Sequence, residues 1–466
     1  MDILAEIFLF YLASGRACSP WTLTAVSRAF RVTAFSTPRL WGHITITNKD
    51  RLSRWAYGSE QCDTLRRLQR ALSRAAAAPL DIVINLRTES NMAPKQDERA
   101  TKLLRTLIRT SSRWVSLYIS DLSMHGFDYR RLEKDYISLE SLVMTATAPM
   151  SLIRAIDRSA RNLTSFESKG LRFVNFTALS DTWWSRLTSL YYKAHTRDDN
   201  PFSRACILTA ITLCVHLRKL TLSTGALRFT TAEIAPIKSR SLPNLRKLYF
   251  INVNCVMLFK CPKLTHLSYE TNHLLPSRHT TIVVDNTEEL RLKRLVYLKV
   301  ESPFVEQYLA PLIAPNLRDL RITVSGTRKA EGLDGAFRNL WEERSEMLSP
   351  KHLQLKGMHL GVNVLKSALE QMEELESLKM TDVKIAKTAL KNFAIKKLKD
   401  KKRSILCPKL VALDVDCSKL EAGEIETILR EVADSRRAAG LPLKSLVCRS
   451  LHSVVDLCEV DPDLSP

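Results

Sequence analysis

A short pattern of proline and leucine recurs along this chain and constrains its fold more than any other feature. The pattern reads PNLRKLYF from Pro243, PKLTHLSY from Pro262, PNLRDLRI from Pro315 and PKLVALDV from Pro408. With looser matching to Leu-x-x-Leu-x-apolar, thirteen segments fit, from WVSLYI at Trp114 to LKSLVC at Leu443. Their mean spacing of about 27 residues is typical of a stacked repeat and too long for the period of a helix.

The spacing within each segment predicts a β-strand. Residues two apart in an extended chain share a face, so the apolar residues at the fourth and sixth positions point inward while the fifth points outward. In LRKLYF the inward pair is Leu248 and Phe250. Proline before the first leucine ends any preceding helix and favours extended geometry in the residue before it. We therefore expect each segment to begin a strand.

Helical spacing between these strands predicts a helix in many of the units. In EIETILREVADSRRAAG the residues Ile425, Ile428, Leu429 and Val432 form one apolar stripe, and Gly440 is a suitable helix terminator. A unit of one strand and one helix buries its apolar face only by stacking on the next unit. The fold class expected is therefore α/β, with parallel strands.

Composition narrows the class of protein further. With 45% apolar and 26% charged residues the chain is expected to be ordered, and no apolar run is long enough to predict a membrane span. No Walker or Gly-x-Gly-x-x-Gly loop is present, and the ten cysteines form no Cys-x-x-Cys pair, so we expect no cofactor and no metal. Free thiols indicate a reducing compartment, and Asp2 and Glu6 are unlike a signal peptide, so a cytoplasmic or nuclear location is expected.

The formal charge of +21 suggests acidic or nucleic-acid partners. Its densest run lies between Lys384 and Arg403, where nine Lys or Arg residues face Asp400 alone. Such a run is either a nuclear-import or phosphate-binding patch or a solvated insertion between two units. We favour the insertion, because most such runs are surface loops.

The first 45 residues predict two short amphipathic helices. Ile3, Leu4, Ile7 and Phe8 share one face of the first, and Ser19-Pro20 begins a second helix that continues through Phe30 to the STPRLW sequence. This region resembles an F-box, in particular the fungal type. The residues that carry the resemblance are Ile3, Leu4, Glu6, Ile7, Phe8, Val26, Ser27, Arg28, Phe30, Arg31, Pro38, Leu40 and Trp41.

The resemblance implies docking on the Skp-family adaptor of an SCF-type cullin-RING ubiquitin ligase. The residues it implies for that surface are Ile3, Leu4, Ile7, Phe8, Leu23, Val26 and Phe30. F-boxes have a Leu-Pro pair just before this point, and Met1 falls where that pair would end, so we expect the first helix to lack its leading turn. The alternative is that these helices only cap the end of the repeat array, which needs an end cover.

Residues 110–458 resemble leucine-rich-repeat proteins, which implies a solenoid with one parallel strand per repeat and about 13 units. The family places Asn or Cys eight residues after the first leucine. Here that position holds Asn272 in one unit but Thr147, Gly225, Val253 and Pro303 in others, so we expect an irregular solenoid.

The expected order along the chain is an F-box-like domain (1–45), a helical connector with the first strand (46–109), the array (110–458) and a tail (459–466). In the connector we expect a helix over Asp63–Ala78 and a strand over Leu80–Leu86, with loops at 87–100 and, within the array, at 326–346.

No Gly-x-Ser-x-Gly or His-Glu-x-x-His occurs, so we expect a non-catalytic protein whose partner subunits supply the ligase chemistry. The predicted function is a substrate receptor, and the alternative is a basic scaffold for RNA or acidic proteins. Outward strand positions would bind an acidic or phosphorylated target. These positions are Lys193, Lys219, Lys247, Tyr249, His266, Tyr297, Lys299, Arg321 and Lys379.

Overall fold

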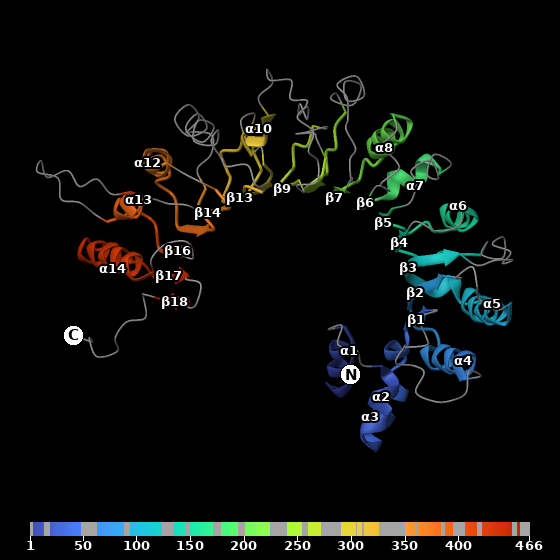
Figure 1. The fold of residues 1–466 in the computed structure, drawn as a ribbon. Coiled ribbons are helices and arrows are strands. Elements are labelled where there is room, and N and C mark those ends of the chain that lie inside the picture. Colours follow the sequence, from blue (N-terminus) through green and yellow to red (C-terminus); the bar gives the residue numbers. More distant parts are fainter. Residues whose placement is uncertain are drawn as a thin grey trace, which may run out of the picture. The chain divides into compact units, whose positions relative to one another are not determined.

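Figure 1 shows the fold of the protein in a computed structural model. The chain forms two compact units, Met1–Leu217 (unit 1) and Arg218–Pro466 (unit 2). The structure describes residues 3–13, 19–47, 63–87, 94–123, 134–145, 150–170, 179–193, 201–223, 240–253, 260–271, 290–303, 305–309, 312–325, 350–358, 361–383, 387–394, 406–416, 422–449 and 454–456.

Unit 1 begins with helices and continues as alternating strands and helices. Its helices are α1 (Ile3–Ala13), α2 (Pro20–Val26), α3 (Arg28–Ser36), η1 (Pro38–Trp41), α4 (Asp63–Ala75), α5 (Pro94–Ile108), η2 (Ser111–Arg113), α6 (Met150–Ser159), α7 (Asp181–Arg186) and α8 (Pro201–Leu213). Its strands are β1 (His43–Thr47), β2 (Leu80–Arg87), β3 (Trp114–Ser123), β4 (Ser141–Thr145), β5 (Ser165–Lys169) and β6 (Ser189–Lys193), and consecutive strands pair in parallel.

Unit 2 repeats the same arrangement. Its strands are β7 (Lys219–Ser223), β8 (Lys247–Ile251), β9 (His266–Glu270), β11 (Tyr297–Glu301), β13 (Asp319–Thr323), β14 (His352–Lys356), β15 (Ser377–Thr381), β16 (Ala412–Asp416) and β17 (Ser445–Arg449), with antiparallel β18 (Val454–Asp456) after them. Its helices are α10 (Val305–Leu309), α12 (Val362–Glu370), α13 (Lys387–Lys391) and α14 (Ala422–Ala438), and β10 (Leu290–Arg291) pairs with β12 (Leu312–Ile313).

The fold is therefore α/β with open parallel sheets, and each of the thirteen predicted segments contains a strand. Among the described residues, unit 1 has six strands and unit 2 has nine that run parallel in chain order without closing into a ring. Figure 1 shows that the helices from α4 to α8 in unit 1, and those of unit 2, lie along one side of the strands, while α1, α2 and α3 lie beyond the β1 end.

The core is built from the leucines that the pattern assigned to it. Leu248 and Phe250 of β8 are buried, as predicted, while Lys247, Tyr249 and Ile251 are at least partly exposed. Parallel pairing places Leu220, Leu248, Leu267 and Leu298 in one row across β7, β8, β9 and β11. The first leucine of the pattern, such as Leu245, is buried in the turn before the strand. Consecutive strands of unit 2 thus share one apolar core.

Two glycines occupy positions where another residue would be strained or would clash. Gly440 ends α14 with φ +79°, and the amide N–H groups of Gly440 and Leu441 donate to the carbonyls of Arg437 and Arg436, which is a Schellman cap. The predicted stripe of α14, Ile425 to Val432, is buried. At Gly42 a Cβ atom would lie 2.6 Å from the carbonyl oxygen of Pro79, so glycine permits the close approach of η1 to the start of β2.

Several sequence predictions need correction. The single helix expected after Pro20 is two, because Ser27 is extended (φ −155°, ψ 170°) and its side chain accepts from the Phe30 amide, capping α3. The strand β1 was missed although HITIT alternates, with Ile44 and Ile46 buried. The loop expected at 87–100 is wrong from Pro94 onward, where α5 begins. The connector helix ends at Ala75 rather than Ala78, because Ala76 takes a positive φ.

Other predictions lie outside the described residues. These are the loop at 326–346, the tail at 459–466, most of the run from Lys384 to Arg403, and the family positions Asn272, Thr147 and Gly225. Val253 and Pro303 are described: Val253 is buried and Pro303 is half-buried.

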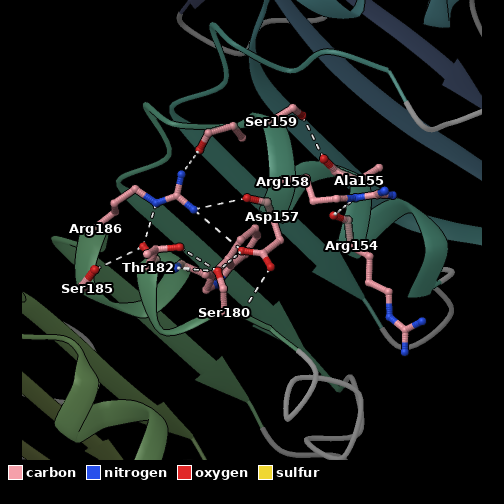
Figure 2. Close-up of polar contacts among 11 residues, drawn as sticks. Arg154, Ala155, Asp157, Arg158, Ser159, Ser180, Thr182, Ser185 and Arg186 are labelled. Atoms are coloured by element: carbon pink, nitrogen blue, oxygen red, sulfur yellow. Dashed lines mark hydrogen bonds and ion pairs between the residues drawn. The ribbon is translucent and has the colours of Figure 1, made fainter.

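Polar side chains join consecutive helices of unit 1, as Figure 2 shows for α6 and α7. The Asp157 carboxylate accepts from the Ser180 hydroxyl at 2.6 Å and from the Ser180 backbone N–H at 3.1 Å. Ser180 in turn caps α7, because its hydroxyl oxygen accepts from the Trp183 amide. Arg186 donates to the Ala160 carbonyl at 2.8 Å and lies 3.8 Å from the Asp157 carboxylate. The contacts fix the start of one helix against the end of the previous one.

Asp157→Ala should lower the free energy of unfolding of unit 1 by about 1–2 kcal/mol, because it removes two hydrogen bonds to Ser180 and leaves a capping residue without its support. The measurement is urea denaturation of the two proteins. Arg154→Ala is the matched control, since Arg154 is an exposed residue of the same helix, and should change stability by less than about 0.5 kcal/mol. Equal effects of the two substitutions would contradict the role of Asp157.

Candidate functional site

The residues from Ile3 to Trp41, here called the N-terminal helical segment, have an aromatic interior of their own. Phe8 and Phe30 pack edge to face with ring centroids 4.8 Å apart, which joins α1 to α3. Trp21 and Trp41 pack in the same way at 4.8 Å, and the indole N–H of Trp41 donates to the Ala34 carbonyl at 2.7 Å. These contacts hold α1, α2, α3 and η1 together.

Arg74 of α4 enters this aromatic cluster. Its guanidinium lies 4.4 Å, 4.0 Å and 4.5 Å from the ring centroids of Trp21, Phe35 and Trp41. Burial, and then the positive charge of Arg70, lower the pKa of Arg74. The cation–π contacts attach the helical segment to the connector helix, and the hydrogen bond from the Asp81 amide to the Gly42 carbonyl attaches it to β2.

The predicted adaptor-binding residues include exposed, half-buried and buried side chains. Ile3 (78% exposed), Ile7 (54%) and Val26 (61%) are exposed, and Leu4 and Phe30 are half-buried. Phe8 and Leu23 are buried, so in this structure they hold the helices together.

Sequence reasoning missed other exposed apolar residues of the segment, namely Phe10, Val32 and Phe35. The sequence held a signal for Phe10, because Ile3, Ile7 and Phe10 follow the spacing of four and three that forms one helix stripe.

The outer face of unit 2 brings together seven of the nine predicted target-binding residues. Register places Lys219, Lys247, His266 and Tyr297 in one row across β7, β8, β9 and β11. A second row, two residues further along, contains Tyr249, Lys299 and Arg321. We call these seven residues the outer-face cluster.

Aromatic rings and cations alternate in the outer-face cluster. The rings of His266 and Tyr297 stack with centroids 5.6 Å apart. The Lys219 ammonium lies 5.9 Å from the centroid of Tyr249, and the Arg321 guanidinium lies 5.2 Å from that of Tyr297. The tyrosine faces are therefore already in contact with cations of the protein itself.

Charge in the cluster is partly neutralised. Lys299 lies 2.8 Å from Glu270 and 3.2 Å from Glu301; burial alone would lower its pKa, but both carboxylates together raise it. Partial burial, and then Lys247, lower the pKa of His266, and Asp319 opposes that shift. Burial and then Tyr297 raise the pKa of Tyr249. Lys299 is thus a weaker candidate for binding an anion than Lys219 or Lys247.

The two remaining predicted target residues lie elsewhere. Lys193 is exposed on β6 in unit 1. Lys379 of β15 lies 3.0 Å from Asp414, which also pairs with Arg449 at 2.9 Å. Burial would raise the pKa of Asp414, but the hydrogen bonds from Arg449 and Lys379 outweigh it, and the pKa is lowered. Lys379 is already paired with an acid.

Four cysteine thiols of the described residues are buried. No three His, Cys, Asp or Glu side chains in these ranges are placed to hold a metal ion. Cys214, Cys261 and Cys407 are buried thiols whose pKa burial raises to about 12, which makes them poor nucleophiles, and Cys448 is also buried. No helix in the described part of the chain is long and apolar enough to cross a membrane.

A comparison with models of known protein families and with curated protein sequences found no match.

Proposed function

We propose that the protein is a substrate-receptor subunit of an SCF-type cullin-RING ubiquitin ligase, with the N-terminal helical segment docked on a Skp-family adaptor and the strands bound to a target protein. The carrying observation is the exposed stripe of Ile3, Ile7 and Phe10 on α1, above an interior that Phe8, Phe30 and Trp41 already fill. Large apolar side chains exposed together on one helix mark an interaction surface. Ubiquitin transfer would belong to the partner subunits.

We further propose that the parallel strands are those of an irregular leucine-rich-repeat solenoid. Support comes from the buried leucine rows and from the one-strand-per-segment order. In this proposal the outer-face cluster binds an acidic or phosphorylated part of the target, and its binding brings target lysines close to the ligase. The compartment proposed is the cytoplasm or nucleus, where buried thiols such as Cys214 stay reduced.

Ile7→Asp should reduce copurification of the Skp-family adaptor by about tenfold or more, because a carboxylate at the centre of an apolar contact is left without a partner. The measurement is coexpression of the tagged chain with the adaptor, followed by affinity purification. Leu4→Asp tests the flank of the stripe. Ile137→Asp is the matched control, since Ile137 is also an exposed isoleucine (53%) but lies outside the segment.

Retention of the adaptor by Ile7→Asp would contradict the docking surface. Absence of the adaptor from the unchanged protein would favour the alternative, a basic scaffold for RNA or acidic proteins in which the segment is only a cap. The specific observation for that alternative is Arg74 among Trp21, Phe35 and Trp41, since it shows that the segment packs on the connector helix. The scaffold predicts RNA retention that weakens steeply with salt.

A further inference from the structure

The turns that precede four strands of unit 2 carry a concentration of exposed cations. We call this surface the basic edge, defined as Arg218, Lys219, Arg246, Lys247, Lys263 and Arg294. All six are exposed, and no ion pair joins any of them to an acid among the described residues. Lys263 donates to the Asn244 side chain, which is neutral.

Backbone hydrogen bonds place these cations next to one another. The Arg218 carbonyl accepts from the amides of Arg246 and Lys247 at 2.9 and 3.0 Å. The Arg246 carbonyl accepts in the same way from Thr265 and His266. Equivalent turn positions are therefore about one strand spacing apart, roughly 4.8 Å, along the amino-terminal ends of β7, β8, β9 and β11.

Three lysines further along unit 2 are arranged differently. Lys351 pairs with Glu376, Lys409 with Glu374, and Lys379 with Asp414. For these three lysines the chain supplies an acid partner. Like charges held this close repel one another, so a surface that lacks such acids is complementary to an external anion.

The acids near the basic edge limit where that anion can lie. Glu270 and Glu301 end β9 and β11, at the opposite end of the strands from the basic edge, and Asp319 begins β13. A polyanion that followed the strand face toward Glu270 would meet repulsion. The favourable path runs across the strands, along the turns.

We propose that the basic edge binds an acidic segment of a protein, running across the amino-terminal ends of β7, β8, β9 and β11. The proposal rests on the proposed function, because the segment would belong to the target of the receptor. The four strands span roughly 14 Å, which about five residues of extended peptide cover. Glutamate or aspartate side chains would alternate between Lys219, Lys247 and the arginines that precede them.

Two observations favour protein over single-stranded nucleic acid at this edge. Nucleic-acid surfaces of that kind combine cations with aromatic faces open for base stacking. Here Tyr249 and Tyr297 are half-buried, and Lys219 and Arg321 lie over their rings. His266 is stacked on Tyr297.

The test uses the full chain and a fluorescein-labelled peptide of about ten residues that alternates Glu and Ser, with binding followed by fluorescence anisotropy. The charge reversal Lys219→Glu with Lys247→Glu should weaken binding by about tenfold or more. Lys219→Arg with Lys247→Arg should retain binding, because it keeps both charges. Lys356→Glu is the matched control, since Lys356 is exposed on β14 away from the edge, and should change affinity less than about twofold.

The proposal is wrong if the peptide does not bind, or if the double reversal binds it as tightly as the unchanged protein. It is equally wrong if a uridine oligonucleotide of matched length binds more tightly than the peptide and is lost in the same double variant. Adaptor copurification, measured on the same preparations, separates the two proposals. If the unchanged protein binds the peptide but not the adaptor, the ligase assignment fails and the basic edge stands. If it binds the adaptor but not the peptide, the basic edge fails and the ligase assignment stands.

Discussion

Arg436→Ala is expected to lower the free energy of unfolding of unit 2 by about 3 kcal/mol or more. The Arg436 side chain is fully buried, and its guanidinium donates to the carbonyls of Leu406, Cys407 and Leu410 at 3.1, 3.0 and 3.3 Å. Burial lowers the pKa of Arg436, and these carbonyls are its hydrogen-bond acceptors in the buried site. Truncation would leave a cavity and remove a partner from each of the three carbonyls.

The adjacent residue supplies the control. Arg437 is exposed and pairs only with Asp434 at 3.5 Å, so Arg437→Ala should cost less than about 0.5 kcal/mol. Hydrogen exchange of the β16 and β17 amides, compared between the two variants, places the effect in unit 2. If both variants exchange at the same rate, the buried guanidinium does not hold α14 to the turn before β16.

Among the described residues, Arg436 is one of three arginines whose side chains donate to backbone carbonyls more than 20 residues earlier in the chain. Arg113 donates to the carbonyls of Ala75 and Ala78 after α4, and Arg186 donates to Ala160 after α6. The last carbonyls of a helix have no partner within that helix, and a guanidinium offers five donors in a fixed plane. Arg113 and Arg186 therefore satisfy carbonyls at or just after the ends of α4 and α6, whereas Arg436 satisfies carbonyls of the turn before β16.

The strands were predictable from sequence because their signal is local. Leu248 and Phe250 are two residues apart and both buried. Pro243, two residues before Leu245, indicates the turn that precedes the strand. The same holds for α14, where four apolar residues and Gly440 define the stripe and the end. A leucine pattern that recurs along the sequence therefore produces a strand that recurs along the structure.

Pairwise contacts were not predictable in the same way. Nothing near Arg436 in sequence indicates that a charged residue inside α14 is fully buried, because its acceptors lie 26 to 30 residues earlier. The neutralisation of Lys299 by Glu270 and of Lys379 by Asp414 also depends on strand register. At the amino terminus, Phe8 and Leu23 are as apolar as Ile3 and Ile7. Only the packing of three helices determines that Phe8 and Leu23 are buried while Ile3 and Ile7 are exposed.

Trp41→Ala is expected to destabilise the N-terminal helical segment by about 3–5 kcal/mol, because it removes a fully packed indole. Trp41 is 2% exposed, packs on Trp21, donates its N–H to Ala34 and lies beneath Arg74. Loss of that ring opens α2, α3 and α4 together. Tryptophan fluorescence would not isolate the effect, so the measurement is hydrogen exchange of the α2 and α3 amides.

Val32→Ala serves as the control for Trp41→Ala, since Val32 is 67% exposed on α3 and should leave exchange unchanged. Trp41→Phe should have an intermediate effect, because it keeps a ring for Arg74 but loses the bond to Ala34. If Trp41→Ala abolishes adaptor copurification while Val32→Ala does not, the segment must be folded in order to dock. Unaltered exchange in Trp41→Ala would mean that the aromatic cluster does not hold the segment, and the exposed stripe on α1 would then have no defined scaffold.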